Sequence, residues 1–123
     1  MGALDIPACA AMMVVCDAAG RLRLAERRDR EGDWGFLGGR VELGESARDA
    51  AVREAWEEAR ILVDECREIY REGGTVTFEA VAWRQDVGEG DCITKWGTWE
   101  EAIAGCFGEY NRSVRRAMGL DRR

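Results

Sequence analysis

Three glutamates stand close together in the middle of the chain, at Glu54, Glu57 and Glu58. In a helix, residues at i, i+3 and i+4 share one side, so these carboxylates would project together. Like charges at this spacing repel each other by roughly a few tenths of a kcal/mol per pair. A divalent cation bound through oxygen offsets that repulsion, and Mg²⁺ favours a few carboxylates completed by water and substrate phosphates. The alternative is a solvated acidic helix face.

Residues around the glutamates favour the metal interpretation. Gly38 and Gly39 precede them, and a backbone without side chains there can present a carbonyl or an amide to a metal or to phosphates. Glu45 lies before the predicted helix, and Arg53 adjoins Glu54. We expect an arginine among carboxylates to orient them through charge-assisted hydrogen bonds rather than to bind the substrate.

The spacing of these residues resembles the Nudix box, written G-x5-E-x7-R-E-U-x-E-E-x-G-U with U aliphatic. The matching segment reads Gly39-x5-Glu45-x7-Arg53-Glu54-Ala55-x-Glu57-Glu58-x-x-Ile61. Every charged position of the box is present at the required spacing. Residues 34–39 and 96–101 also resemble the segments that flank the box in this family, so the resemblance extends over nearly the whole chain.

The resemblance implies a hydrolase in which water attacks a phosphorus of a nucleoside diphosphate linked to another group. The ligands that it implies for Mg²⁺, or for Mn²⁺, are Glu54, Glu57, Glu58 and a carbonyl of Gly39 or Gly38. Arg53 and Glu45 would orient these ligands. The metal would neutralise the developing charge and lower the pKa of the attacking water.

The general base stays open between two places in the chain. Glu54 is one candidate, and an acid of the loop 86–91 is the other. Glu89 and Asp91 are the candidates in that loop, with solvated loop acids as the alternative interpretation.

A nucleobase needs an aromatic or apolar slot in which to stack. The candidates are Trp34, Phe78, Trp83 and Trp96, with core packing as the alternative for each. Members of the resembled family that act on ADP-ribose or dinucleoside polyphosphates share a proline or a tyrosine shortly after the box. Residues 75–79, which occupy that place here, contain neither residue. This absence favours a MutT-like enzyme that cleaves a nucleoside triphosphate, including oxidised or non-canonical ones, to monophosphate and pyrophosphate. Hydrolysis of nucleotide sugars, ADP-ribose or dinucleoside polyphosphates is the alternative.

Two positions depart from the family pattern. Arg60 replaces a glycine that usually forms a left-handed helix cap, a conformation that costs other residues about 1 kcal/mol. We therefore expect a longer helix or a different exit at Arg60. Leu37 stands where relatives often carry proline, which loosens the loop before Gly38. Neither change removes a metal ligand.

The helix that carries the glutamates should begin at Ala47, because Ser46 is a good N-cap and Asp49 follows three residues later. It should end near Ala59 or Arg60. Its alanines repeat at i+4 and form a narrow apolar face suited to close packing.

Other elements follow from apolar alternation and turn signals. We expect strands at residues 8–16, 21–27, 61–70, 75–83 and 95–99. A capping box at Thr98 to Glu101 predicts a short helix, and a final helix near residues 109–118 should stop at Gly119. These elements predict one α/β (α+β) domain over residues 1–123. The resemblance implies a Nudix-type α/β/α sandwich with a central mixed sheet, the box helix on one face and a C-terminal helix on the other.

Composition excludes several classes of protein. The chain has no histidine, which rules out Ser-His-Asp and Cys-His nucleophiles and argues against structural zinc. The net charge of −6 argues against a nucleic acid polymer as partner. Five cysteines without a C-x-x-C pair indicate reduced thiols. Residues 1–8 carry no signal-like pattern, and no apolar run could cross a membrane.

From these observations we expect a cytoplasmic protein with a small-molecule nucleotide as its substrate and with no membrane partner. A homodimer is left open. Two non-enzymatic hypotheses also remain at this point: a nucleotide-binding Nudix module without turnover, and an interaction domain with an acidic surface helix.

Overall fold

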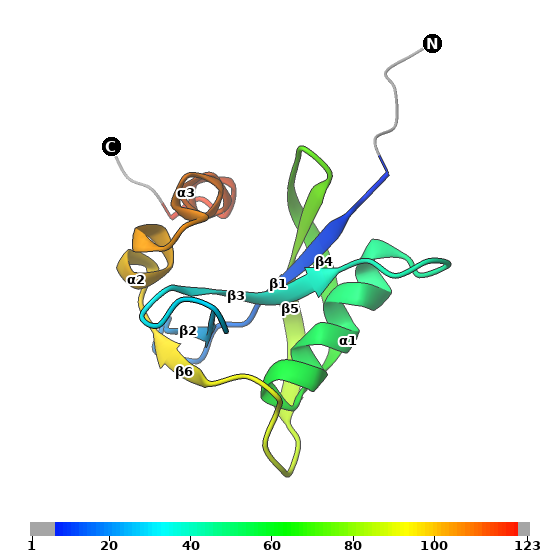
Figure 1. The fold of residues 1–123 in the computed structure, drawn as a ribbon, viewed down its shortest axis with the longest axis horizontal. Coiled ribbons are helices and arrows are strands. Elements are labelled where there is room, and N and C mark those ends of the chain that lie inside the picture. The colour runs from blue at the N-terminus through cyan, green and yellow to red at the C-terminus, as the bar shows by residue number, and fades with distance from the viewer. Residues whose placement is uncertain (1–6, 121–123) are drawn as a thin grey trace.

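The computed structural model describes residues 7–120 and contains a six-stranded sheet with the order β4-β5-β1-β3-β2-β6 (Figure 1). The strands are β1 (Ala10–Val14), β2 (Leu22–Glu26), β3 (Trp34–Arg40), β4 (Ile61–Glu72), β5 (Thr75–Gln85) and β6 (Thr94–Gly97). β1 runs parallel to β5, and the other neighbouring strands are antiparallel. The sheet is therefore mixed, as the family resemblance implied.

Helices cover both faces of the sheet. Helix α1 (Ala47–Ala59) lies on one face, and α2 (Trp99–Ala104) and α3 (Gly108–Ala117) lie on the other (Figure 1). β1 serves both layers, because Met13 packs in the core under α1 while Val14 packs with Trp99 and Val114 under the other helices. This arrangement confirms the predicted α/β/α sandwich. None of the helices described between residues 7 and 120 has the length and hydropathy that a bilayer crossing requires.

Helix α1 approaches the sheet closely because its inner face is made of alanines. The buried residues of this helix are Ala50, Ala51, Ala55 and Ala59. The helix begins after Ser46, whose hydroxyl oxygen accepts a hydrogen bond of 3.0 Å from the amide of Asp49. Because the fully buried side chains of this helix are methyl groups, the helix lies close enough for Glu58 to reach the backbone amide of Gly38 in β3.

The expected longer helix or altered exit at Arg60 is wrong. Arg60 adopts the left-handed conformation itself, with φ 56° and ψ 37°, and its amide donates to the carbonyl of Trp56 at 2.8 Å. The conformation costs a non-glycine residue about 1–2 kcal/mol. The Arg60 guanidinium carbon lies 3.8 Å from the centre of the Trp56 ring, a stacking contact that returns about 0.5–1 kcal/mol at an exposed site.

The sequence did not predict β3, which lies between β1 and β2. Three of its seven residues are glycines, which are depleted in strands. The other strands match expectation except at their ends. β1 is shorter than the apolar run 8–16, and Trp99 opens α2 instead of closing the last strand.

Candidate active site

Helix α1 and strand β3 bring two of the box glutamates against the paired glycines. The amide of Gly38 donates a hydrogen bond to Glu58 Oε1 at 3.0 Å. A Cβ built on Gly39 would lie 2.4 Å from Glu54 Oε2. The space that a side chain at Gly39 would fill is therefore occupied by the Glu54 carboxylate.

Arg53 connects the remaining carboxylates. Its Nε and Nη2 donate to the two oxygens of Glu45 at 2.7 and 3.0 Å, while Nη1 donates to Glu54 and Glu57 at 3.2 and 3.1 Å. Nη2 also donates to the carbonyl of Arg40, which ties the group to the end of β3. The hydrogen bonds to Arg53 hold the pKa of Glu45 below its usual range, and those to Glu45 raise the pKa of Arg53.

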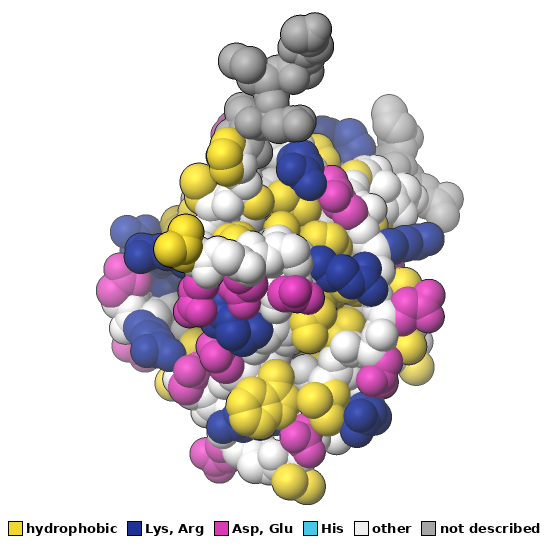
Figure 2. Space-filling view, turned by 90° about the vertical axis from the view of Figure 1, so that its right-hand side faces the viewer, with side chains coloured by type: hydrophobic (Ala, Val, Ile, Leu, Met, Phe, Trp, Pro, Cys, Tyr) yellow, Lys and Arg dark blue, Asp and Glu magenta, His cyan; other side chains and the backbone are white. Residues whose placement is uncertain are grey.

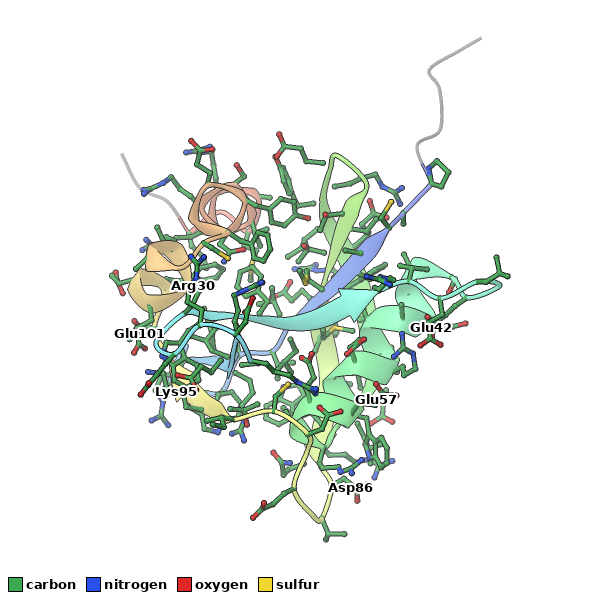
Figure 3. All side chains as sticks on the ribbon, viewed as in Figure 1. Arg30, Glu42, Glu57, Asp86, Lys95 and Glu101 are labelled. Carbon is green, nitrogen blue, oxygen red and sulfur yellow. The ribbon has the colours of Figure 1, made fainter. Side chains whose placement is uncertain are left out.

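The face that carries these groups is strongly acidic. Figure 2 shows acidic side chains gathered there with basic side chains among them. Glu42 adds a fourth carboxylate near Arg53, at 3.8 Å from Nη1, and lies on the α1 side of the molecule with Glu57 (Figure 3). The arginine thus stands among four acids, of which Glu42 was not predicted.

Glu58 is the box glutamate that the backbone of β3 holds. Its burial, with the charges of Glu54 and Asp91, raises the pKa of Glu58 to about 8, while the hydrogen bond from Gly38 acts in the opposite direction. The side chain of Glu57 is 40% exposed. The three glutamates therefore differ: one is held by backbone, and the other two share the arginine.

The donor set fits a hard divalent cation. Glu54, Glu57 and Glu58 offer only oxygen, as Mg²⁺ and Mn²⁺ prefer, and the backbone of Gly38 and Gly39 lies against Glu58 and Glu54. A cation would also compensate the repulsion that raises the pKa of Glu58. Among residues 7–120, no three acidic or thiol side chains already form a closed ion site. Glu57 instead accepts a hydrogen bond from Arg53 Nη1 at 3.1 Å.

A cavity of about 300 Å³ adjoins the carboxylates and shares Gly38 and Glu58 with them. Its walls include Trp34, Phe36, Phe107, Asn111, Arg27 and Arg28. Lys95 Nζ lies 4.3 Å from the centre of a Trp34 ring, and the Arg27 guanidinium carbon lies 5.3 Å from the centre of the Phe107 ring. Aromatic rings beside cations suit a ligand that has a flat base and negative charge.

The aromatic candidates divide into two groups. Trp34 lines the cavity, whereas Phe78 is only 6% exposed and packs in the core under α1. Trp83 and Trp96 pack against each other, with ring centres 5.6 Å apart. Only Trp34 of the four is placed where it could stack on a base in this cavity.

The two loop acids also differ in position. Asp91 Oδ1 lies 3.3 Å from Arg28 Nη2, and Arg28 lines the cavity. The side chain of Glu89 is exposed, and its backbone carbonyl accepts a hydrogen bond from Arg60 Nε at 3.2 Å. The structure therefore places Asp91 beside the cavity, between its ion-pair partner Arg28 and its chain neighbour Cys92, which both line it.

Sequence reasoning missed several residues of the cavity wall. Arg28 stood in what read as a charged loop, and Phe107 in an unassigned connection between helices. Asn111, which is 3% exposed and donates to the carbonyl of Ala102 at 2.9 Å, gave one usable signal. A buried amide in an otherwise charged helix indicates a specific polar partner.

Comparisons with known proteins agree with this geometry. The family model described as the NUDIX domain matches residues 7–104. Among solved structures, a chain from a study of MutT of Aliivibrio salmonicida and Vibrio cholerae has a TM-score of 0.70 at 24% identity, covering 92% of this chain and 98% of that one. The E. coli ORF135 protein has a TM-score of 0.68 at 24% identity, covering 91% and 93%.

A third similar structure is the E. coli dihydroneopterin triphosphate pyrophosphohydrolase, with a TM-score of 0.62 at 18% identity, covering 90% of this chain and 97% of that one. At these identities the solved structures support the fold alone. No curated protein matches the chain. The family match spans most of the sequence, including both glycines, the box helix and the capping box of α2. The chain therefore belongs to the Nudix family and is a Nudix hydrolase.

Proposed function

We propose that the protein hydrolyses a nucleoside triphosphate, including oxidised or non-canonical ones, to monophosphate and pyrophosphate with Mg²⁺, for which Mn²⁺ can substitute. One observation carries the proposal: the cavity and the box carboxylates share Gly38 and Glu58. A base stacked on Trp34 would direct its phosphates to the carboxylate helix. Dinucleoside polyphosphates and nucleotide sugars are the alternative substrates.

The chain's own residues supply orientation and charge. Arg53 holds Glu54 and Glu57, and Glu45 in turn fixes the guanidinium through two hydrogen bonds. Arg28 supplies a cation at the cavity wall that suits a phosphate oxygen. When bound, the divalent ion neutralises the developing charge on phosphorus and lowers the pKa of the attacking water.

Two groups remain as candidate general base. Glu54 lies within the carboxylate cluster, and Asp91 pairs with Arg28, which lines the cavity. We propose to separate them by single-turnover rates of Glu54→Gln, Asp91→Asn and Glu89→Gln. The base is the residue whose change slows the chemical step while nucleotide binding is retained. Glu89, whose side chain is exposed, serves as the loop comparison.

The proposed function is tested with a panel of nucleoside triphosphates, oxidised nucleotides, nucleotide sugars, ADP-ribose and dinucleoside polyphosphates, with product identification. We expect Mg²⁺-dependent release of monophosphate and pyrophosphate from a triphosphate. Glu57→Gln and Glu58→Gln should each lower kcat by more than about a hundredfold, since they remove ligands rather than the outer partners whose loss costs 10–100-fold. Turnover of a nucleotide sugar or ADP-ribose to two monophosphates, or of a dinucleoside polyphosphate to two nucleotides that share its phosphates, would assign the alternative substrate class instead.

A non-catalytic module on the same fold predicts saturable nucleotide binding without turnover. A purely structural domain predicts that divalent cations leave thermal stability unchanged. A true cation site should gain about 3 kcal/mol of unfolding free energy at a hundredfold excess over its dissociation constant. Melting curves with and without Mg²⁺ therefore distinguish a protein with a cation site from a purely structural domain before any substrate is known.

A further inference from the structure

The loop between β5 and β6 lies directly against the C-terminal end of α1. The amide of Asp91 donates to the carbonyl of Glu57 at 2.8 Å. A Cβ built on Gly90 would lie 2.0 Å from the carbonyl oxygen of Glu58, so the loop backbone lies directly against the helix backbone there. The loop is therefore attached at the turn of α1 that carries two of the box glutamates.

Side chains also hold the other end of this loop against α1. We call the set of Trp56, Arg60 and the loop residue Asp86 the α1 latch. Arg60 stacks on Trp56 at 3.8 Å, and the Trp56 indole nitrogen donates to Asp86 Oδ2 at 2.9 Å. Arg60 Nε donates to the carbonyl of Glu89, and the Arg60 carbonyl accepts from the amide of Asp86 at 2.7 Å. In Figure 3, Glu57 lies on α1 and Asp86 lies past the C-terminal end of this helix.

Helix capping alone does not explain an arginine at this position. Glycine adopts the left-handed conformation without strain, whereas Arg60 adopts it at φ 56°. The side-chain contacts of Arg60 go to the loop at Glu89 and to Trp56, which itself binds the loop through Asp86. Trp56 is 38% exposed, so core packing does not account for it either.

The loop ends at Asp91, which connects it to the reaction site. Asp91 pairs with Arg28 at 3.3 Å, and the carbonyl of Asp91 also accepts from Arg28 Nη2. Arg28 and Glu58 both line the cavity. Any displacement of the loop therefore moves Asp91 and releases Arg28 at the place where the cavity meets the carboxylates.

We propose that Arg60 is a positioning residue: through the α1 latch it holds the loop 86–91 so that Asp91 and Arg28 stay at the junction of cavity and carboxylates. The role in turnover rests on the proposed function, but the role in holding the loop does not. The test therefore measures the loop directly as well as the reaction.

Arg60→Gly is the informative variant because glycine keeps the helix cap and removes the two side-chain contacts of Arg60, to the Trp56 ring and to the Glu89 carbonyl. The hydrogen bond from Trp56 to Asp86 stays in place. We expect its melting temperature to stay within about 4 °C of the wild type, since lost contacts and relieved strain oppose each other. Amide hydrogen exchange at Asp86 and Asp91 in the metal-free protein should become about tenfold faster, as for a segment that opens locally. We expect kcat to fall about tenfold, as for loss of an outer positioning partner.

Two further variants keep the test specific. Trp56→Phe retains a ring for Arg60 and loses the indole donor to Asp86, so it should release the Asp86 end of the loop. Arg67→Ala is the control, because it also removes one exposed arginine but breaks only a pair with Glu79 on the β4–β5 hairpin. It should leave exchange in the loop 86–91 unchanged.

Two results would overturn the proposal. Unchanged exchange at Asp86 and Asp91 in Arg60→Gly would show that Arg60 does not hold the loop. Faster exchange with unchanged kcat would show that the loop's position does not matter to the reaction. If the wild type turns over no nucleotide, the proposed function fails on its own, and Mn²⁺ affinity measured by calorimetry becomes the second readout. This affinity should weaken in Arg60→Gly. An unchanged affinity overturns the positioning role.

Discussion

Two neighbouring glycines of β3 meet different obstacles, although both belong to the same short motif. A Cβ on Gly39 would meet the end of a flexible side chain, the Glu54 carboxylate, at 2.4 Å. A Cβ on Gly38 would lie 2.4 Å from the backbone carbonyl oxygen of Ala11 in β1. The first obstacle can move aside and the second cannot. We therefore expect glycine at position 39 to matter for activity and glycine at position 38 to matter for stability.

Gly39→Ala should therefore keep the fold and lose activity. We expect a melting temperature near that of the wild type and a loss of kcat of about 10–100-fold, as Glu54 is displaced from its place. Gly38→Ala should instead destabilise the protein by about 1–3 kcal/mol, the usual cost of overpacking. Melting curves and initial rates on both variants check the pair. Equal loss of stability in the two would contradict this division.

At the residue scale, charged groups were predictable and aromatic ones were not. Helical periodicity puts Glu54, Glu57 and Glu58 on one side of a helix, and the family resemblance added Arg53 and Glu45, which precedes the helix. Phe78 and Trp34 both lie on strands, and only the strand's register decides which face a side chain takes. That register placed Phe78 in the core and Trp34 at the cavity.

Among the elements, α2 is short and depends on its N-terminal cap. Thr98 accepts from the amide of Glu101 at 3.1 Å, and Glu101 accepts from the amide of Thr98 at 2.9 Å, so the predicted capping box is present. Lys95 of β6 pairs with the same glutamate, and the two lie near each other at the β6–α2 junction (Figure 3). The hydrogen bond to Lys95 holds the pKa of Glu101 below its usual range.

Thr98→Ala should destabilise the protein by about 1 kcal/mol, which corresponds to a fall in melting temperature of roughly 4 °C. The physical reason is loss of the hydroxyl that satisfies an orphan amide of α2. Ser113→Ala is the matched control, because the Ser113 hydroxyl only donates to the Glu109 carbonyl within α3. If the two variants have the same melting temperature, the cap does not contribute to stability.

Elements with strong local signals were predictable, and those fixed by neighbours were not. Helix α1 has both a cap and an alanine stripe, and its bounds agree with expectation. β3 owes its extended form to β1 and β2 on either side, which its glycine-rich sequence cannot indicate. The cap at Arg60 likewise depends on Trp56 and on a loop far along the chain.

At the scale of the whole molecule, the cavity exists only because the sandwich closes. Its wall combines Arg27 after β2, Trp34 of β3, Glu58 of α1 and Phe107 before α3. These segments are distant in the sequence, and no local pattern relates them. The fold class could be inferred from the box and its flanks, whereas the cavity required the arrangement of all three layers.

The α3 layer is fastened to the sheet by Tyr110. Its hydroxyl lies 2.7 Å from Thr77 Oγ1 and donates to the carbonyl of Thr75 at 3.2 Å. The ring also packs edge-on against Tyr70, with centres 5.2 Å apart. Burial of the phenol is the main cause that raises the pKa of Tyr110 to about 12. The folded protein therefore holds this proton more tightly than the unfolded chain does.

This linkage predicts a loss of stability in alkaline solution with a defined window. Below pH 10 both states keep the proton, so Tyr110→Phe should be less stable than the wild type by about 1 kcal/mol, the net worth of its hydrogen bonds. Between pH 10 and about 12 only the unfolded chain ionises at this position, which favours unfolding of the wild type. The stability gap between the two proteins should therefore narrow with rising pH. Urea unfolding at pH 8 to 11 measures the gap, while all other titrating groups cancel in the difference. A gap that stays constant or widens across this range would show that the Tyr110 hydroxyl is not shielded by the packing of α3 on β5.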